Sequence, residues 1–222
     1  MNFEPFFKQY EALVEQVESA FENVKSQYPD CVQCKVGCSD CCHALFDLTL
    51  IEALYIKHQF DLKYADETRR ELIGRANEAD RKTIRLKRQA QKEHLEGKTE
   101  NQILEQMASK RVRCALLDDD NRCAMYEARP LTCRLYGIPT VIGGKGHCCG
   151  LSGFEAGQAY PTVKLDAIYA RLQALSHELA QTIQSRYPQL GDMLVPLSMA
   201  LLTDYTAEYL GVKTGQDKAR KE

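Results

Sequence analysis

Residues 31–43 read CVQCKVGCSDCCH, so five of these thirteen positions are cysteine and a histidine ends the run. Cys31 and Cys34, and then Cys38 and Cys41, have the Cys-x-x-Cys spacing that lets two thiolates reach one metal centre. The alternative is a scatter of buried cysteines, which pack as small hydrophobic side chains. Two such pairs close together, followed by five more cysteines downstream, favour metal binding of some kind.

The five downstream cysteines lie in a second irregular segment, RVRCALLDDDNRCAMYEARPLTCRLYGIPTVIGGKGHCCG, at residues 111–150. Residues 114–117 and 123–126 flank an Asp/Asn turn, which predicts one small β-hairpin. The glycines at 143, 144 and 146 predict a flexible approach to the second Cys-Cys pair. All ten cysteines therefore occupy two loop-rich segments, 31–43 and 114–149.

The segments around the cysteines have helical patterns. Apolar residues recur at helical spacing over residues 3–24, up to Tyr28-Pro29. Thr49 and Glu52 have the form of a capping box, which predicts a helix from there to about Gln59. This places residues 41–43 just before a helix N-terminus, where the helix dipole favours anions such as thiolates.

Longer helices are expected in the remainder of the chain. Residues 61–110 suit long helices, Tyr160-Pro161 opens a helix to about residue 187, and residues 191–210 predict a final helix central to the core. The fold class is thus mainly α: a helical domain enclosing a loop-rich cysteine cluster, with at most one small β-hairpin. We expect a single metal-binding domain over residues 1–212, with its cysteine core at 31–150, and a disordered tail at 213–222.

Composition narrows the class of partner and the compartment. The net charge of −2 gives no general reason to expect nucleic acid or an anionic membrane. The basic stretch RKTIRLKRQAQK at 81–92 has no interleaved aromatic residue for base stacking, and we interpret it as a solvated helix face. With no secretory signal or long apolar run, we expect a cytoplasmic protein with a redox or protein partner, without membrane or nucleic acid. In a reducing cytosol, ten cysteines indicate metal or thiol chemistry rather than a disulfide framework.

The adjacent cysteine pairs, 41–42 and 148–149, constrain the metal site further. Neighbouring side chains point in different directions, so each pair either bridges two nearby centres or leaves one thiol unligated. Thiolate-rich sites suit zinc and iron–sulfur clusters alike. His43 and His147 could replace a thiolate, and we rank both below the cysteines. Arginines near the second segment, Arg129 and Arg134 foremost, could hydrogen-bond to sulfur or compensate its charge.

The block CAMYEARPLTCR at 123–134 and the run CSDCC at 38–42 resemble the bacterial zinc- or iron-chelating cysteine-cluster family of the YkgJ type. That family shows a CxxCxxCC motif and then a C-x-x-Y-x-x-R-P-x-x-C-R block. The block is matched here by Cys123, Tyr126, Arg129, Pro130, Cys133 and Arg134. The first motif differs from the CxxCxxCC pattern of the family, because three residues rather than two separate Cys34 from Cys38. The resemblance implies metal or iron–sulfur binding and no settled activity.

The leading hypothesis is an iron–sulfur protein, with a 4Fe–4S cluster held by thiolates from both segments and a role in electron transfer, cluster-dependent chemistry or metal handling. The alternatives are a zinc protein whose structural metal presents a partner surface, and a dithiol/disulfide redox protein. Two metal centres remain an option, since ten thiols exceed the needs of one. The expected ligands, in order, are Cys38, Cys41, Cys42, Cys123 and Cys133, then Cys34 and Cys114, then Cys31, Cys148 and Cys149.

Overall fold

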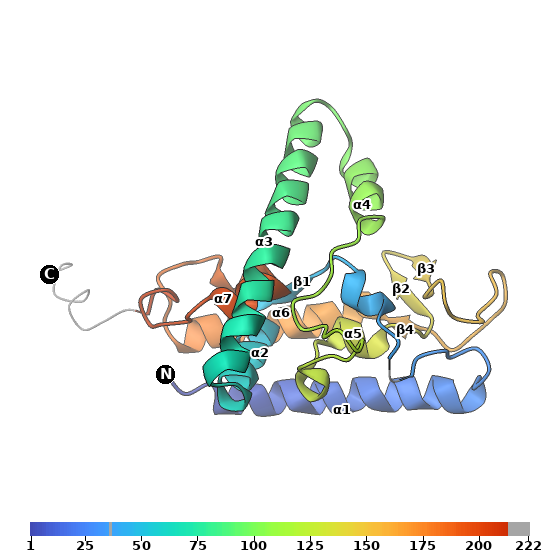
Figure 1. Cartoon of the computed structure of the whole chain (residues 1–222), viewed down its shortest axis with the longest axis horizontal. Helices are drawn as coiled ribbons and strands as arrows, with labels where there is room; N and C mark the ends of the chain where they lie inside the picture. The colour runs from blue at the N-terminus through green and yellow to red at the C-terminus, as the bar shows by residue number, and fades with distance from the viewer. Residues whose placement is uncertain (36, 213–222) are drawn as a thin grey trace, which may run out of the picture.

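The computed structural model describes residues 1–35 and 37–212, and the tail predicted to be disordered, 213–222, lies outside this range. The described residues are mainly α-helical, with a few short strands, which confirms the expected class (Figure 1). The helices are α1 (Glu4–Gln27), α2 (Leu50–Lys63), α3 (Asp66–Leu95), α4 (Glu100–Ala108), α5 (Leu131–Leu135), α6 (Leu165–Thr182) and α7 (Leu197–Leu202). The strands are β1 (Asp47–Thr49), β2 (Thr140–Ile142), β3 (Lys145–His147), β4 (Val163–Lys164) and β5 (Leu194–Pro196). Three single turns of 3-10 helix are η1 (Asp40–His43), η2 (Tyr126–Ala128) and η3 (Leu190–Asp192).

Helix α1 confirms the first predicted helix. Its buried face carries Phe6, Tyr10, Leu13 and Val17, which follow the 3.6-residue period of an amphipathic helix. Pro5 lies in its first turn, where backbone N–H groups have no acceptor within the helix, so that proline costs no hydrogen bond there. The helix runs along one side of the molecule (Figure 1), where it packs against α2, α5 and α6.

Helix α2 lies at the centre of the core. Nine of its fourteen residues are buried, from Leu50 through Phe60, so it is covered on several sides. The predicted capping box is present: the Thr49 side chain bonds to the N3 backbone, and Glu52 bonds back to the backbone N–H of Thr49. The strand β1 separates η1 from this helix, so the cysteines of η1 do not directly precede its first turn.

The prediction of a long final helix over residues 191–210 is wrong. The region forms η3, the strand β5, the six-residue helix α7 and then turns. The reason is a long-range pairing, because Val195 lies opposite Leu48 in an antiparallel ladder of β1 and β5. Pro196, at the end of β5, has no N–H to continue a helix through that point. The central helix is thus α2, and α7 packs against α2 and α3.

The small hairpin lies later in the chain than expected. Residues 114–126 contain only a bridge between Leu117 and Cys123, not two strands. The hairpin is β2–β3, joined by Gly143 and Gly144 with positive φ angles of 54° and 77°, the pattern of a type I′ turn. Strand β4 adds to β2 in parallel, which delays the start of α6 to Leu165. The helix ends at Thr182 rather than near residue 187, where a bridge from Ser185 to Val212 takes over.

Helices α3 and α4 form an arm that projects from the body, with α4 packed beside the far part of α3 (Figure 1). The basic stretch at 81–92 lies in α3, and Arg81, Arg85 and Arg88 are exposed, as expected for a solvated face. Lys87 instead contacts Asp47 at 2.7 Å, which links the arm to β1. Among the described residues, no helix combines the length and the hydrophobicity needed to cross a bilayer.

Candidate metal centre

The two cysteine-rich segments lie side by side through backbone hydrogen bonds. The N–H of Cys114 donates to the carbonyl of Cys42 at 2.7 Å, and the N–H of Val112 donates to the carbonyl of His43 at 3.0 Å. An antiparallel bridge between Ala44 and Arg111 extends this contact. Cysteines more than seventy positions apart in the sequence are therefore fixed next to one another by the backbone itself.

A charged contact adds to this junction. Arg111 donates to the backbone carbonyl of Asp40 at 2.9 Å and forms an ion pair with its carboxylate. The same carboxylate lies 3.6 Å from the sulfur of Cys149, so the loop after β3 also reaches η1. Arg111 therefore joins the two cysteine-rich segments.

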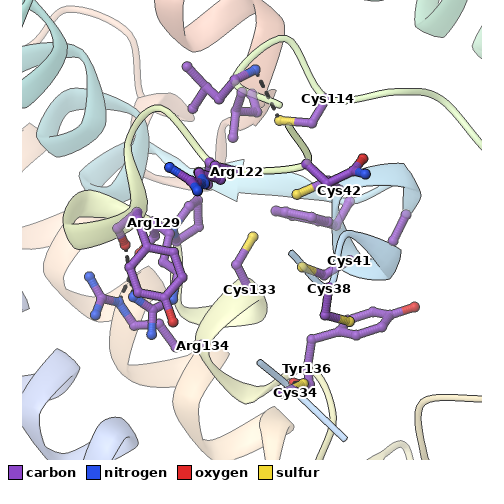
Figure 2. Close-up of a pocket in the computed structure, with 18 of the residues that line it drawn as sticks. Cys34, Cys38, Cys41, Cys42, Cys114, Arg122, Arg129, Cys133, Arg134 and Tyr136 are labelled. Atoms are coloured by element: carbon purple, nitrogen blue, oxygen red, sulfur yellow. Dashed lines mark hydrogen bonds between the residues drawn. The ribbon is translucent and has the colours of Figure 1, made fainter. Parts of the chain in front are cut away.

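Seven cysteines line one cavity with a volume of about 620 Å³, which we call the cysteine cavity. They come from both segments: Cys34, Cys38, Cys41, Cys42, Cys114, Cys123 and Cys133. Figure 2 shows the sulfur of Cys133, on α5, pointing toward the side of the cavity where Cys41 and Cys42 lie. The structure thus brings together the seven highest-ranked of the ten predicted ligands.

The position of Cys133 depends on a buried carboxylate. Helix α5 is only five residues long and begins after Pro130. Glu52, which is 3% exposed, accepts the N–H of Leu131 at 3.1 Å in the first turn of α5. This hydrogen bond ties the short helix that carries Cys133 to the central helix α2.

Cys41, Cys42 and Cys133 shift one another's pKa values. Hydrogen bonds from the Cys133 and Cys42 thiols stabilise a thiolate at Cys41 and lower its pKa to about 3. The same hydrogen bonds to Cys41, together with burial, raise the pKa values of Cys133 and Cys42. A cation bound here would replace these thiol protons, so metal binding would release protons.

The surrounding thiols are kept protonated by burial. Desolvation raises the pKa of Cys114 and that of Cys34 to about 12 each. Burial also raises the pKa of Cys123, and the positive charge of Arg129 partly opposes this effect. Coulombic interactions link five of these side chains in one group, the inner thiols: Cys41, Cys42, Cys114, Cys123 and Cys133.

The thiols surround a cavity rather than a point. Within residues 1–35 and 37–212, no three His, Cys, Asp or Glu side chains converge as tightly as a single bound ion requires. The donor set is nevertheless chemically suited to soft or borderline metals, because thiolates select zinc, copper(I) and iron–sulfur clusters. Seven thiols around one space exceed the four that a single zinc ion takes.

Three predicted ligands lie outside the lining of the cavity. Cys148 is exposed, and Cys149 lies beside Asp40, within Coulombic range of Cys38. The carbonyl of Cys31 accepts the N–H of Gly153 at 2.9 Å, which anchors the loop after β3. Neither His43 nor His147 is among the described residues that line the cavity. One nitrogen of the His43 ring bonds instead to the carbonyl of Ser39 at 3.0 Å.

The two arginines expected near the sulfurs both line the cavity and have partners of their own. Arg134 is buried, bonds to the carbonyl oxygens of Arg129 and Glu127, and forms an ion pair with Glu18 of α1. Arg129 lies over the ring of Tyr126, 4.0 Å from its centroid. Arg134 therefore joins α5 to α1. The positive charge of Arg129 acts on Cys123 and partly offsets the rise that burial causes in the pKa of its thiol.

Gly137 allows the sulfur of Cys34 to approach the backbone after α5. The Cys34 thiol donates to the carbonyl of Tyr136 at 3.1 Å. A Cβ atom at Gly137 would lie 2.2 Å from that sulfur, and the φ angle of +107° already disfavours any side chain. The sequence contained no signal for this contact, because nothing marks Gly137 apart from other glycines.

We expect Gly137→Ala to displace Cys34 and to destabilise the fold by about 1–3 kcal/mol more than a matched glycine, as overpacking does. The control is Gly144→Ala, which shares a positive φ, +77°, but has no atom within 4 Å of the added Cβ. Denaturant unfolding of the two variants measures the difference, and the metal content reports the displacement of Cys34. Equal stability losses would contradict the close approach of Cys34.

Comparison with known proteins gives one match. A family model described as "CxxCxxCC: Putative zinc- or iron-chelating domain" matches residues 33–150, which is more than half of the chain. The matched range contains nine of the ten cysteines, including all seven that line the cysteine cavity. No curated protein and no solved structure matches the chain.

Proposed function

The chain belongs to the CxxCxxCC family of zinc- or iron-chelating domains, and from this membership we propose that its cysteine cavity binds a 4Fe–4S cluster. The observation that carries the proposal is the set of seven cysteines, drawn from both segments, that line one cavity. Iron–sulfur clusters are held by four cysteine thiolates, so the five inner thiols can supply a full ligand set. A space between the sulfurs suits a multi-atom core better than a single ion, whose thiolate ligands converge on one point.

Two features of the chain favour an anionic metal–thiolate centre. Neighbouring thiols lower the pKa of Cys41, which favours the thiolate form that a metal ligand requires. Arg129 adds positive charge near Cys123, which offsets part of the negative charge that thiolates bring. When bound, an iron–sulfur cluster supplies one-electron transfer or an iron site for chemistry, and we propose a role in one of these or in metal handling.

The cysteines outside the inner group can serve a second centre. Cys34 lies within Coulombic range of Cys38 and Cys149, so these three thiols form a neighbouring group. Cys41 also contributes to the raised pKa of Cys34 and so interacts with both groups. This arrangement supports the idea that the adjacent pair, Cys41 and Cys42, serves two nearby centres.

Purification without oxygen tests the proposal. We expect a brown protein with visible charge-transfer absorption, and with iron and acid-labile sulfide in equal amounts. Stoichiometric zinc, without iron or sulfide, would contradict the cluster and favour the alternative of a closed structural zinc site. A protein without metal, in which Cys41 and Cys42 cycle between dithiol and disulfide, would favour the redox alternative.

A further inference from the structure

The cysteine cavity is larger than a metal centre needs. At about 30 Å³ per atom, the share of a water molecule in the liquid, an eight-atom 4Fe–4S core occupies on the order of 240 Å³. The cavity has a volume of about 620 Å³, within the range of small-molecule sites. Much of its wall is apolar and carries no metal ligand, including Phe21, Leu45, Phe46, Leu116 and Leu197.

The wall of the cavity also has an excess of positive charge. Among the described residues that line it, six are basic and two are acidic: Lys25, Lys35, Arg113, Arg122, Arg129 and Arg134, against Glu18 and Glu22. Figure 2 shows Arg122 and Arg129 on one side of the cavity, with Cys38 and Tyr136 on the opposite side. The cavity thus has a side rich in arginine and a side rich in thiols.

Most of these basic groups already have partners within the protein. Arg134 is held by Glu18 and two carbonyl oxygens, and Arg129 lies over Tyr126 and bonds to its carbonyl at 2.8 Å. Arg113 bonds to the carbonyl of Asp118 at 2.6 Å. Each of these three arginines is therefore at least partly engaged within the protein.

Arg122 differs from them. In the described part of the chain, its guanidinium group has no hydrogen bond and no ion pair, although its backbone N–H donates to the Asp118 carboxylate at 2.7 Å. Asp118 also accepts the N–H of Asp120 at 3.0 Å, so its carboxylate is engaged with the backbone of the turn. The turn therefore holds Arg122, which is exposed to solvent, at the edge of the cavity, and its five guanidinium donors are free of described protein partners.

We propose that the cysteine cavity binds a small organic acid beside the metal centre, with its anionic group on Arg122 and its apolar body against Phe46 and Leu197. This inference extends the proposed function. It rests on that function for one point, the 4Fe–4S cluster next to which the acid would bind. A planar guanidinium group binds a carboxylate, or another oxyanion, through two parallel hydrogen bonds. The apolar wall removes the body of the acid from water, which adds to the affinity in proportion to the apolar area buried.

Two fluorescent probes of nearly the same shape test the proposal on anaerobically purified protein. One is 1-anilinonaphthalene-8-sulfonate, which has an apolar body and one anionic group, and the other is N-phenyl-1-naphthylamine, which lacks the charge. We expect one anionic probe to bind per chain, more tightly than the neutral probe. Arg122→Gln should weaken the anionic probe about tenfold and leave the neutral probe unchanged.

Two further variants complete the test. Leu197→Trp fills the apolar part of the cavity and should weaken both probes. Arg85→Gln removes an exposed arginine on α3, outside the cavity, and should change neither. Equal binding of the two probes to the native protein would overturn the proposal, as would an Arg122→Gln variant that binds like Arg85→Gln.

Iron and sulfide assays on the same preparations separate this inference from the proposed function. A protein with iron and sulfide but without preference for the anionic probe would contradict the acid site alone. A protein that prefers the anionic probe through Arg122 but has no iron or sulfide would contradict the cluster and support the acid site.

Discussion

Cys133→Ser is expected to lower the affinity of the protein for its metal by more than the roughly 10–100-fold that changes around a ligand cause. Cys133 is the one described cavity cysteine on an α-helix, and its thiol interacts with Cys41 in the inner group. A serine hydroxyl has nearly the same size but is a poor ligand for soft metals. Metal analysis of the purified variant should therefore find only a small fraction of the native content.

The matched control is Cys148→Ser, which makes the same chemical change at an exposed cysteine outside the cavity. We expect it to keep most of the metal and the visible spectrum. Far-ultraviolet circular dichroism of both variants shows whether the helices remain. Equal metal contents in the two variants would contradict the assignment of Cys133 to the inner ligand group.

Glu52→Ala is expected to lower the free energy of unfolding by about 2–6 kcal/mol, at about 1–3 kcal/mol for each of two buried backbone groups left unsatisfied. These are the N–H of Thr49, 3.2 Å from one carboxylate oxygen, and that of Leu131, 3.1 Å from the other; the Thr49 hydroxyl, 3.1 Å from the first oxygen, loses its acceptor as well. The change also frees the start of α5, so metal content should fall as well. Glu52→Gln should have an intermediate effect, because only one of its two terminal atoms can accept a hydrogen bond.

The burial of Glu52 also predicts how the stability of the protein depends on pH. Burial raises its pKa above the ordinary value for glutamate, about 4.3. Between that pH and the raised pKa, the folded state binds a proton that the unfolded state has lost, so stability falls as the pH rises. Glu52→Gln should remove this slope, whereas Glu105→Gln, on the exposed arm, should keep it. Identical slopes in the two variants would contradict the burial of an ionisable group at position 52.

Local patterns in the sequence were sufficient for the first helices. The apolar stripe of α1 and the capping box of α2 each lie within one short window, so the sequence alone predicts both. The region 191–210 could not be predicted in this way, because its structure depends on the pairing of Val195 with Leu48, far away in the sequence. An apolar run without clear periodicity fits a strand and a helix equally well.

The hairpin β2–β3 is a different case, because its signal was present in the sequence. Gly143-Gly144 between the two short runs is a known pattern for a type I′ turn, and flexibility was the weaker interpretation. The hairpin was predicted instead around the acidic turn at residues 118–121. Few backbone hydrogen bonds join the two sides of that turn, among them the one from the N–H of Ala124 to the carbonyl of Leu116 at 2.7 Å.

The sequence identified the cysteines that line the cavity but not the geometry that brings them together. Cysteine spacing and the family resemblance identified the ten candidate thiols, and the structure selects seven of them for one cavity. The selection depends on contacts without a sequence signal, namely the backbone bond from Cys114 to Cys42 and the ion pair of Asp40 with Arg111. The unpartnered Arg122 was likewise only one of several arginines in the segment until its surroundings were known.

The central claim is that cysteines from two distant segments hold one metal centre, and alkylation of the thiols under anaerobic conditions tests it most directly. The protein is treated with iodoacetamide before and after metal removal by a chelator, and each cysteine is followed by mass spectrometry. We predict that Cys42 and Cys114, together with the other inner thiols, are protected in the metal-loaded protein and all lose this protection in proportion to the metal removed, while Cys148 reacts in both states. Protection of cysteines from only one segment, or loss of protection at different fractions of metal removed in the two segments, would contradict the shared centre.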